Sequence, residues 1–242
     1  MNNMKTYEEI VDAKLVAYTQ MDPDYGVPLA DAQELIAYCA KVSNPSSIKQ
    51  EDMENSERLI KFLMKHSHWS PLEMVNAVVR IDTTRDIGRQ LIRHPTFRFQ
   101  EFSQRYAAAL TGDDQGIQLV KSEARLQDHK NRQNSIELKD SDLTTSERIL
   151  LKSWWNDVQE ELANYIDVYY QKALDKGLAK ETARKLLPEG MTTTTMFVNG
   201  TLRSWIHYAD LRMGNGTQKE HILIAKAAAE AIHKIFPMME KL

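Results

Sequence analysis

The sequence predicts an α+β fold in which long helices flank a central antiparallel or mixed sheet. Three observations predict it: several segments with helical periodicity, two short β-branched segments between them, and no internal repeat or linker that would divide the chain. The 242 residues, of which 42% are apolar and 27% charged, have the composition of a globular protein. We therefore expect a single domain spanning 1–242.

The first half of the chain is expected to contain three helices and one strand. Apolar side chains recur at helical spacing in two segments, a β-branched run follows, and a third segment has helical character up to a proline. The expected elements are helices over 29–42, 51–65 and 83–94 and a strand over 74–82. A turn is expected at Ser70, because a residue before proline disfavours helix, and Pro95 should end the third helix.

The second half begins with a polar segment, 107–146, that is poor in large apolar residues and predicts a long loop or flap without a core. Helical periodicity then resumes. The expected elements are helices over 146–177, 179–187, 202–212 and 217–236 and an extended segment over 192–198. Gly177 is the expected C-cap of the longest helix, and Thr217 and Glu220 have capping-box spacing at the start of the last one.

Charge and composition exclude several classes of function. The net charge of −3 and the pI near 6.2 disfavour a nucleic-acid-binding module, and no segment approaches the roughly 18 apolar residues of a membrane span. Cys39 is the single cysteine, which suits a cytoplasmic protein, and its helical apolar stripe favours a core residue over a nucleophile. No metal is expected, because His66, His68 and Glu73 lack a further ligand at suitable spacing.

The densest cluster of functional side chains is RHPTFRFQEFSQRY at 93–106, with three arginines and four aromatic residues. Arginine forks suit phosphates and the carbonyl edges of heterocycles, so the stretch favours a flat, anionic ligand. On a helix, i,i+4 spacing would place four polar side chains on one stripe: Arg89, Gln90, Arg93 and His94. The alternative is that these cations only complement the dipole at a helix C-terminus.

Further candidate residues lie in the C-terminal half of the chain. Arg203 and His207 share a helix face at i,i+4 spacing, and Arg212 comes at a helix end before a glycine-containing turn. Each also fits a solvated helix face, and Arg184 by itself is typical of a surface residue. No phosphate-binding glycine loop, dinucleotide fingerprint or nucleophile elbow occurs, so a bound nucleotide would rest on side-chain arginines.

At these residues the chain resembles the flavin-dependent thymidylate synthases. That family's signature, Arg-His-Arg, seven residues and then Ser, corresponds here to Arg93-His94-Pro95, seven residues and Ser103. The flanking stretches LMKHSHWSPLE, GRQLIRH and SQRY are similar to the family, and ARKLLP, LRSWIHYADLR and a Gln-x-Glu at 218–220 follow in its order. The resemblance covers about 28–106 and 177–236.

Two features depart from the family pattern. Pro95 stands where the third signature residue is Arg, which puts flavin affinity in question unless Arg98 reaches the same space. The alternative function is therefore a non-catalytic flavin- or nucleotide-binding paralogue. The chain is also one residue longer between Pro188 and Arg203, so that either Asn199 or Thr201 fills the family's flavin-contacting Asn position.

The resemblance implies the conversion of dUMP to dTMP, with methylenetetrahydrofolate as carbon donor and NADPH as reductant through FAD. It also implies a homotetramer whose active sites are shared between subunits. In the unrelated thymidylate synthases a cysteine attacks the pyrimidine, and Cys39 is badly placed for that role. Here C5 of the pyrimidine must instead gain electron density, and a cation at the N3/O4 edge would stabilise the negative charge that develops.

The resemblance assigns roles to individual residues. The residues implied to bind dUMP are Gln90, Arg93, Glu101, Phe102, Ser103, Gln104, Arg105, Arg184 and Arg212. Those implied to bind FAD are Ser70, Arg93, His94, Pro95, Glu101, Asn199 or Thr201, Arg203 and His207, with His68 near the flavin ring. The residues implied to take part in catalysis are Arg212, which would promote ionisation at N3, Ser103 and His68.

Overall fold

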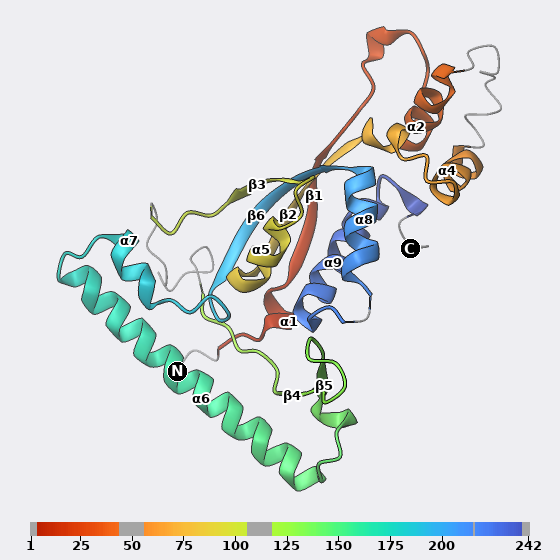
Figure 1. Ribbon diagram of the computed structural model, residues 1–242. Helices are drawn as coiled ribbons and strands as arrows, with labels where there is room; N and C mark the ends of the chain where they lie inside the picture. The colour runs from red at the N-terminus through yellow and green to blue at the C-terminus, as the bar shows by residue number, and fades with distance from the viewer. Residues whose placement is uncertain (1–3, 44–55, 106–117, 215, 239–242) are drawn as a thin grey trace.

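The computed structural model describes residues 4–43, 56–105, 118–214 and 216–238. Its centre is a four-stranded antiparallel sheet in the order β1-β2-β6-β3 (Figure 1). The strands are β1 (Asp12–Tyr18), β2 (Asn76–Thr84), β6 (Thr193–Thr201) and β3 (Arg98–Glu101). The predicted α+β class and the antiparallel sheet are confirmed, and the two predicted extended segments correspond to β2 and β6. The sequence does not predict β1 or β3.

The pairing of β2 with β6 forms the middle of the sheet. It runs through nine residue pairs, from Asn76 opposite Thr201 to Thr84 opposite Thr193. Alternate side chains of both strands are buried in the main core. These buried side chains include Ala77, Val79, Ile81, Met196 and Val198. The opposite face is more exposed, and Phe197 on that face has 42% of its surface accessible.

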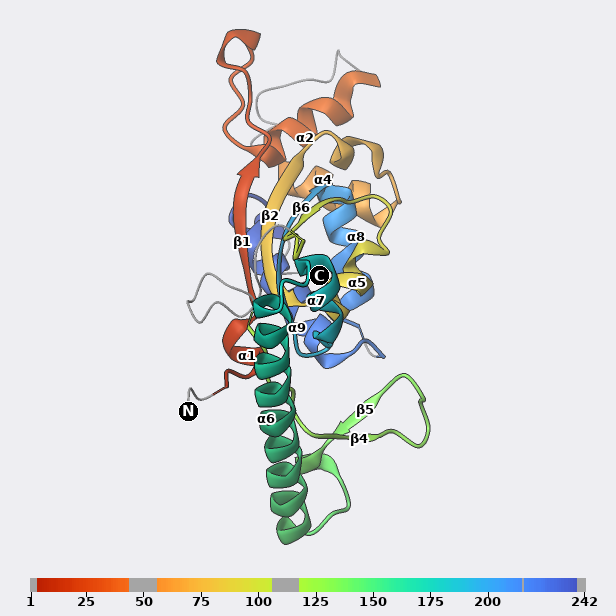
Figure 2. The same cartoon turned by 90° about the vertical axis from the view of Figure 1, so that its left-hand side faces the viewer.

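Helices pack on the buried face and at one end of the sheet. α5, α8 and α9 contact the strands, and α2 with α4 packs beyond the end where β2 begins (Figure 1, Figure 2). The bounds are α1 (Tyr7–Ile10), α2 (Ala32–Ala40), α4 (Ser56–Lys65), α5 (Arg85–Ile92), α8 (Leu202–Arg212) and α9 (Lys219–His233). None of the helices in the described segments is long and apolar enough to cross a lipid bilayer.

The bounds of two predicted helices differ from the structure, and the start of a third is not described. Asp31 caps α2 by accepting hydrogen bonds of 2.8 and 2.9 Å from backbone amides of its first turn, so the helix begins after residue 31 and not at 29. α5 begins at Arg85 and not at residue 83, because residues 83–84 belong to β2. It ends at Ile92, with Arg93 as its C-cap, because the chain turns at 93–94. Of the predicted helix 51–65, residues 51–55 lie outside the described residues.

The loop or flap predicted over 107–146 stays a prediction: 107–117 lies outside the described residues, and the rest contains two buried residues and a short hairpin. Leu119 and Val120 are buried, with 9% and 1% of their surface exposed. β4 (Arg125–Gln127) pairs with β5 (Ser135–Glu137) in a hairpin. Leu119 belongs to a hydrophobic cluster with residues of the helix that follows this segment.

Ion pairs fasten the hairpin to the start of α9. Arg125 Nη2 lies 2.7 Å from both carboxylate oxygens of Glu220, which is 6% exposed. Lys219 Nζ lies 2.6 Å from Glu123 and 2.8 Å from Glu137. The predicted capping box is therefore wrong: the Glu220 carboxylate binds Arg125, and Gln218, not Thr217, is the N-cap of α9.

The longest helix, α6 (Thr145–Asp175), closely matches its prediction. A capping box between Thr144 and Glu147 starts it, and Gly177 (φ 82°) ends it. The amide of Gly177 donates to Leu174 O (2.8 Å), and the amide of Leu178 donates to Ala173 O (3.0 Å). These two bonds form a Schellman motif, which confirms the predicted glycine cap.

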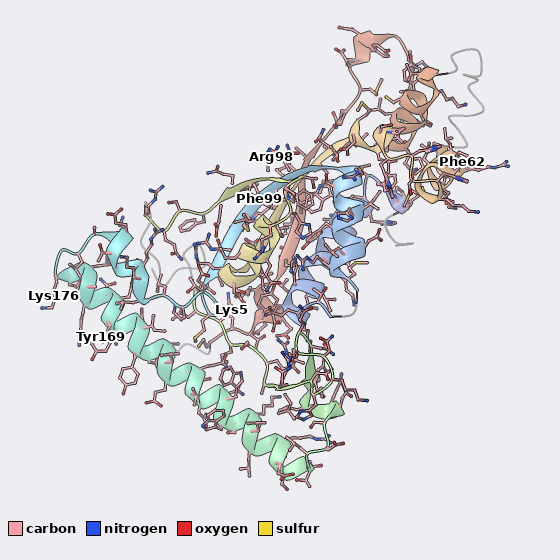
Figure 3. The ribbon with its side chains drawn as sticks, in the orientation of Figure 1. Lys5, Phe62, Arg98, Phe99, Tyr169 and Lys176 are labelled. Carbon is pink, nitrogen blue, oxygen red and sulfur yellow. The ribbon has the colours of Figure 1, made fainter. Side chains whose placement is uncertain are left out.

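α6 separates a second hydrophobic cluster from a row of exposed apolar residues. The second cluster consists of Leu119, Ala163, Ile166, Tyr170, Ala173, Ala183 and Leu187. The exposed row includes Trp154, Leu162, Tyr165, Val168 and Tyr169, and Tyr169 points away from the body of the molecule (Figure 3). The predicted helix 179–187 is found as α7 (Lys180–Ala183) followed by a 3₁₀ turn, Arg184–Leu186. The single domain over 1–242 stays a prediction.

The contact between Gly200 and Phe97 gives a test of the packing. The ring of Phe97, 2% exposed, lies where a Cβ at position 200 would be, and it also packs 4.4 Å from the ring of Trp205. We expect Gly200→Ala to lower the free energy of unfolding by about 1–3 kcal/mol, because the added methyl overpacks this core. Gly190→Ala is the control, since a methyl there meets no atom within 4 Å. Equal losses in urea unfolding of the two variants would contradict this packing.

Candidate active site

The turn that follows α5 brings His94 against the end of α8. Arg212 Nε donates a 3.0 Å hydrogen bond to His94 Nε2, which is possible only if that nitrogen carries no proton. Burial, and then the charges of Arg212 and His207, lower the pKa of His94 to about 4. The neutral imidazole of His94 therefore orients the Arg212 guanidinium. This hydrogen bond does not use the two terminal nitrogens of Arg212, Nη1 and Nη2.

The prediction of one polar stripe on α5 is wrong. Arg89 Nε contacts Glu189 (3.2 Å) at the surface, and Arg93 is exposed at the C-cap. His94 lies beyond the helix end and turns inward, where it is 7% exposed. Gln90 alone points with His94 toward α8 and α9, and its Nε2 donates a 2.8 Å bond to Gln218. The i,i+4 spacing does not produce one stripe, because α5 ends at Ile92, two residues before its predicted end.

A second group of predicted residues lies at the start of α8. Thr201 caps this helix and donates 2.7 Å to Glu73, whose other oxygen lies 3.4 Å from Arg203 Nε. Ser70, exposed, belongs to the same 3₁₀ turn as Glu73 (Ser70–Glu73). His207 follows one turn after Arg203 and is also exposed.

His68 is exposed and comes just before the 3₁₀ turn Ser70–Glu73. Its ring lies 6.2 Å from those of Phe62 and His66, measured between ring centroids. Phe62 belongs to α4, which Figure 3 shows at the far end of the molecule from α6. His68 therefore lies with Ser70 and Arg203 at the α4–α8 end of the molecule.

Arg98 occupies the space next to Pro95. Its Nη1 donates hydrogen bonds of 2.9 Å to the carbonyl oxygens of Pro95 and Phe97 (Figure 3). Asn199 is the register partner of Arg98 across β3 and β6, and it is exposed. The Thr201 hydroxyl, in contrast, is already bonded to Glu73.

The segment after β3 holds the remaining predicted residues. Glu101 accepts from Arg85 (3.2 Å) and Thr194 (3.0 Å), which fixes its carboxylate between α5 and β6. Ser103 Oγ accepts a long bond, 3.4 Å, from the Arg105 amide. Tyr106 lies outside the described residues.

Phe102 and Gln104 connect this segment with Arg184. Phe102 packs against the second cluster, which contains Ala183 and Leu187 on either side of Arg184. Gln104 is 4% exposed, and its Nε2 has no hydrogen-bond partner within the described part of the chain. A buried donor of this kind fits a ligand acceptor. The structure therefore forms three groups of predicted residues: one around Arg212, one at the start of α8 and one beside the second cluster.

Comparisons with known proteins agree with this architecture. The structure resembles the UMP/dUMP methylase PolB from Streptomyces cacaoi bound with 5-Br UMP, with a TM-score of 0.72 at 20% identity over 96% of this chain and 92% of that one. The same methylase bound with 5-Br dUMP gives a TM-score of 0.71. At this identity the likeness shows a shared fold and no more.

The family follows from the sequence matches. The family described as "Thymidylate synthase complementing protein" matches residues 14–238. The probable flavin-dependent thymidylate synthase of Paramecium bursaria Chlorella virus 1 is 42% identical over 96% of this chain and 98% of that protein. The flavin-dependent thymidylate synthase of Synechocystis sp. is 42% identical over 88% of this chain and 89% of that protein. The chain belongs to the flavin-dependent thymidylate synthase family, which confirms the resemblance.

The pH dependence of stability tests the neutral state of His94. Its folded pKa of about 4 lies below its ordinary value of 6.5, so the unfolded chain takes up a proton that the folded chain does not. The stability that His94 contributes is complete above about pH 6.5 and is lost as the pH falls toward about 4. We expect His94→Gln to reduce this loss by up to about 1.4 kcal/mol per pH unit. Urea unfolding at several pH values measures it, and identical pH profiles would contradict the assignment.

Proposed function

We propose that this chain converts dUMP to dTMP, with methylenetetrahydrofolate as carbon donor and NADPH as reductant through FAD. The observation that carries the proposal is the bond between Arg212 and a buried, neutral His94. Membership of the family supports the same reaction. The buried Nε2 of Gln104, which has no hydrogen-bond partner among the described residues, supports a ligand beside the β3 segment.

Arg212 has the properties that activation of the pyrimidine needs. C5 of uracil is a weak nucleophile, and it becomes stronger when negative charge develops along the N3/O4 edge of the ring. A guanidinium fixed at that edge stabilises this charge, and its planar fork matches the two ring atoms. His94 holds the fork through Nε and, being neutral, leaves Arg212 as the cation of this pair.

The chain's nucleophiles do not fit attack on the pyrimidine. Ser103 has the Arg105 backbone amide as its hydrogen-bond neighbour, which does not activate a hydroxyl as a base would. Cys39 is half-buried in α2, and burial raises the pKa of its thiol. We infer that Ser103 binds and orients dUMP, together with Arg105 and Arg184.

FAD fits the exposed donors near the start of α8 and β3. Its diphosphate is anionic, and its ring presents carbonyl and nitrogen acceptors. The donors that would hold it are Arg93, Arg98, Asn199, Arg203 and His207, with Ser70 and His68 nearby. FAD would supply the hydride transfer that reduces the transferred one-carbon group.

Arg98 lies beside Pro95 and supports flavin binding without the third signature arginine. Asn199 is favoured over Thr201, whose hydroxyl already binds Glu73.

A homotetramer would complete the site. The exposed apolar row of α6 and the uncovered Phe197 face of the sheet offer surfaces for other subunits. The groups around Arg184 and Arg212 pack on different clusters of one chain, so a neighbouring subunit could bring them to a shared ligand. The alternative, a non-catalytic paralogue, would retain FAD and lose turnover.

Replacement of Arg212 tests the reaction. We expect Arg212→Ala to keep bound FAD and the fold but to lower the rate of dTMP formation by about 10²–10³, because the stabilising donor is lost in the activated state. Arg212→Lys should recover only part of the rate, since an ammonium lacks the planar fork. Arg132→Ala, on the exposed hairpin turn, is the control.

The measurement is single-turnover oxidation of the reduced protein with dUMP and methylenetetrahydrofolate, with product analysis. A parent protein that binds FAD but forms no dTMP would favour the non-catalytic paralogue. A normal rate in Arg212→Ala would remove this residue from the mechanism. A protein without flavin absorbance, and unable to bind added FAD, would contradict the proposed cofactor.

The mass of the protein in solution tests the predicted homotetramer. Sedimentation should give a particle of four times 27.9 kDa, because the exposed apolar surface of α6 needs a partner. Tyr165→Asp should shift the distribution to smaller species by placing a charge in that surface. Asp167→Asn, on an exposed position of the same helix, is the control. A fully active species of one chain would contradict the shared site.

A further inference from the structure

Gln90 belongs to a line of polar side chains that reaches from the core to the β4–β5 hairpin. Its Nε2 donates to Gln218 Oε1 at 2.8 Å, and its Oε1 lies 3.0 Å from His221 Nδ1. His221 Nε2 lies 3.1 Å from the hydroxyl of Tyr208. His221 and Tyr208 are buried, with 0% and 1% of their surface exposed, and neither is among the residues that the sequence pointed to.

At one end of this line, the Glu220 carboxylate determines which group donates and which accepts in each hydrogen bond. Burial opposes ionisation of Glu220, but the hydrogen bond and charge of Arg125, with a further bond from the Gln218 side chain, lower its pKa. A carboxylate only accepts, so the Gln218 amide must turn its NH₂ group toward Glu220. Gln218 Oε1 then faces Gln90 and accepts from it, as the 2.8 Å contact requires.

The direction fixed at Glu220 continues through Gln90 into the core. Since Gln90 donates through Nε2, its Oε1 must accept, and His221 must carry its proton on Nδ1. His221 Nε2 then accepts from the hydroxyl of Tyr208, whose pKa is raised by burial. Burial, followed by the charges of Arg212 and His94, lowers the pKa of His221 to about 3 and keeps the ring neutral.

We propose that His221 is a positioning residue for dUMP binding: with Tyr208 it fixes the Gln90 amide so that its second N–H donates to an acceptor oxygen of the nucleotide. This inference rests on the proposed function, which places Gln90 against dUMP. An unrestrained glutamine amide can turn over and exchange its donor with its acceptor. Turning Gln90 over here would break its bonds to both His221 and Gln218, so the donor is oriented before the nucleotide binds.

A double-mutant cycle tests whether His221 acts through Gln90. Calorimetric titration of FAD-loaded protein gives the dissociation constant of dUMP for the parent, His221→Leu, Gln90→Ala and the double variant. We expect His221→Leu to weaken dUMP binding by about three- to tenfold, as the loss of one hydrogen bond does. In the Gln90→Ala background the same change should have little further effect, because the amide to be positioned is gone.

Three further variants keep the test decisive. Tyr208→Phe removes one hydroxyl from the core and should weaken dUMP by a smaller factor, because His221 can then protonate either nitrogen. His221→Asn should recover binding, since its amide can donate to Gln90 from a similar position. His233→Leu is the control on the same helix, about 18 Å along its axis from His221.

The outcomes separate this inference from the proposed function. A parent protein that does not bind dUMP would overturn the proposed function. A parent that binds dUMP, with unchanged affinity in both His221→Leu and Tyr208→Phe, would overturn the inference alone. Equal and additive losses from His221→Leu with and without Gln90 would also overturn it, because they would indicate a general structural effect. If His221→Leu does not fold, Tyr208→Phe and His221→Asn decide.

Discussion

The antiparallel pairing of β2 with β6 is the constraint on which the site depends. β2 ends at Thr84 beside the start of β6, and β6 ends at Thr201 beside the start of β2, so the following helices leave from opposite ends of the sheet. α5 and α8 both pack over the buried face of the sheet, and their C-terminal ends lie next to each other. That meeting brings His94 to Arg212 across 118 positions of sequence.

Burial sets the charges of the site. His94 and His221 are neutral chiefly because they are buried, and each can therefore accept a hydrogen bond on one nitrogen. Arg212 contributes to both shifts, since a nearby cation disfavours a second one. Glu220, equally buried, stays charged because Arg125 lies against it. The same core thus holds Arg212 as a cation and Glu220 as a carboxylate.

Elements that carry their own signals were predictable from the sequence. α6 has a capping box and a terminal glycine, and β2 and β6 have β-branched runs, so local residues suffice. The β4–β5 hairpin was not predictable, because the Arg125–Glu220 pair that holds it joins residues 95 positions apart. The family signature led to Gln90 and His94, but His221 was missed; its one signal is a histidine directly before the apolar run of α9.

The central claim is that Arg212, held by neutral His94, binds the pyrimidine of dUMP. The most direct measurement is the position of bromine in crystals of the FAD-loaded protein with 5-bromo-dUMP, located by its anomalous scattering. The account predicts the bromine next to the end of α8, with the N3/O4 edge of the ring within hydrogen-bonding distance of the Arg212 guanidinium. Bromine on the exposed face of the sheet, or at the start of α2, with Arg212 still bonded only to His94, would contradict it.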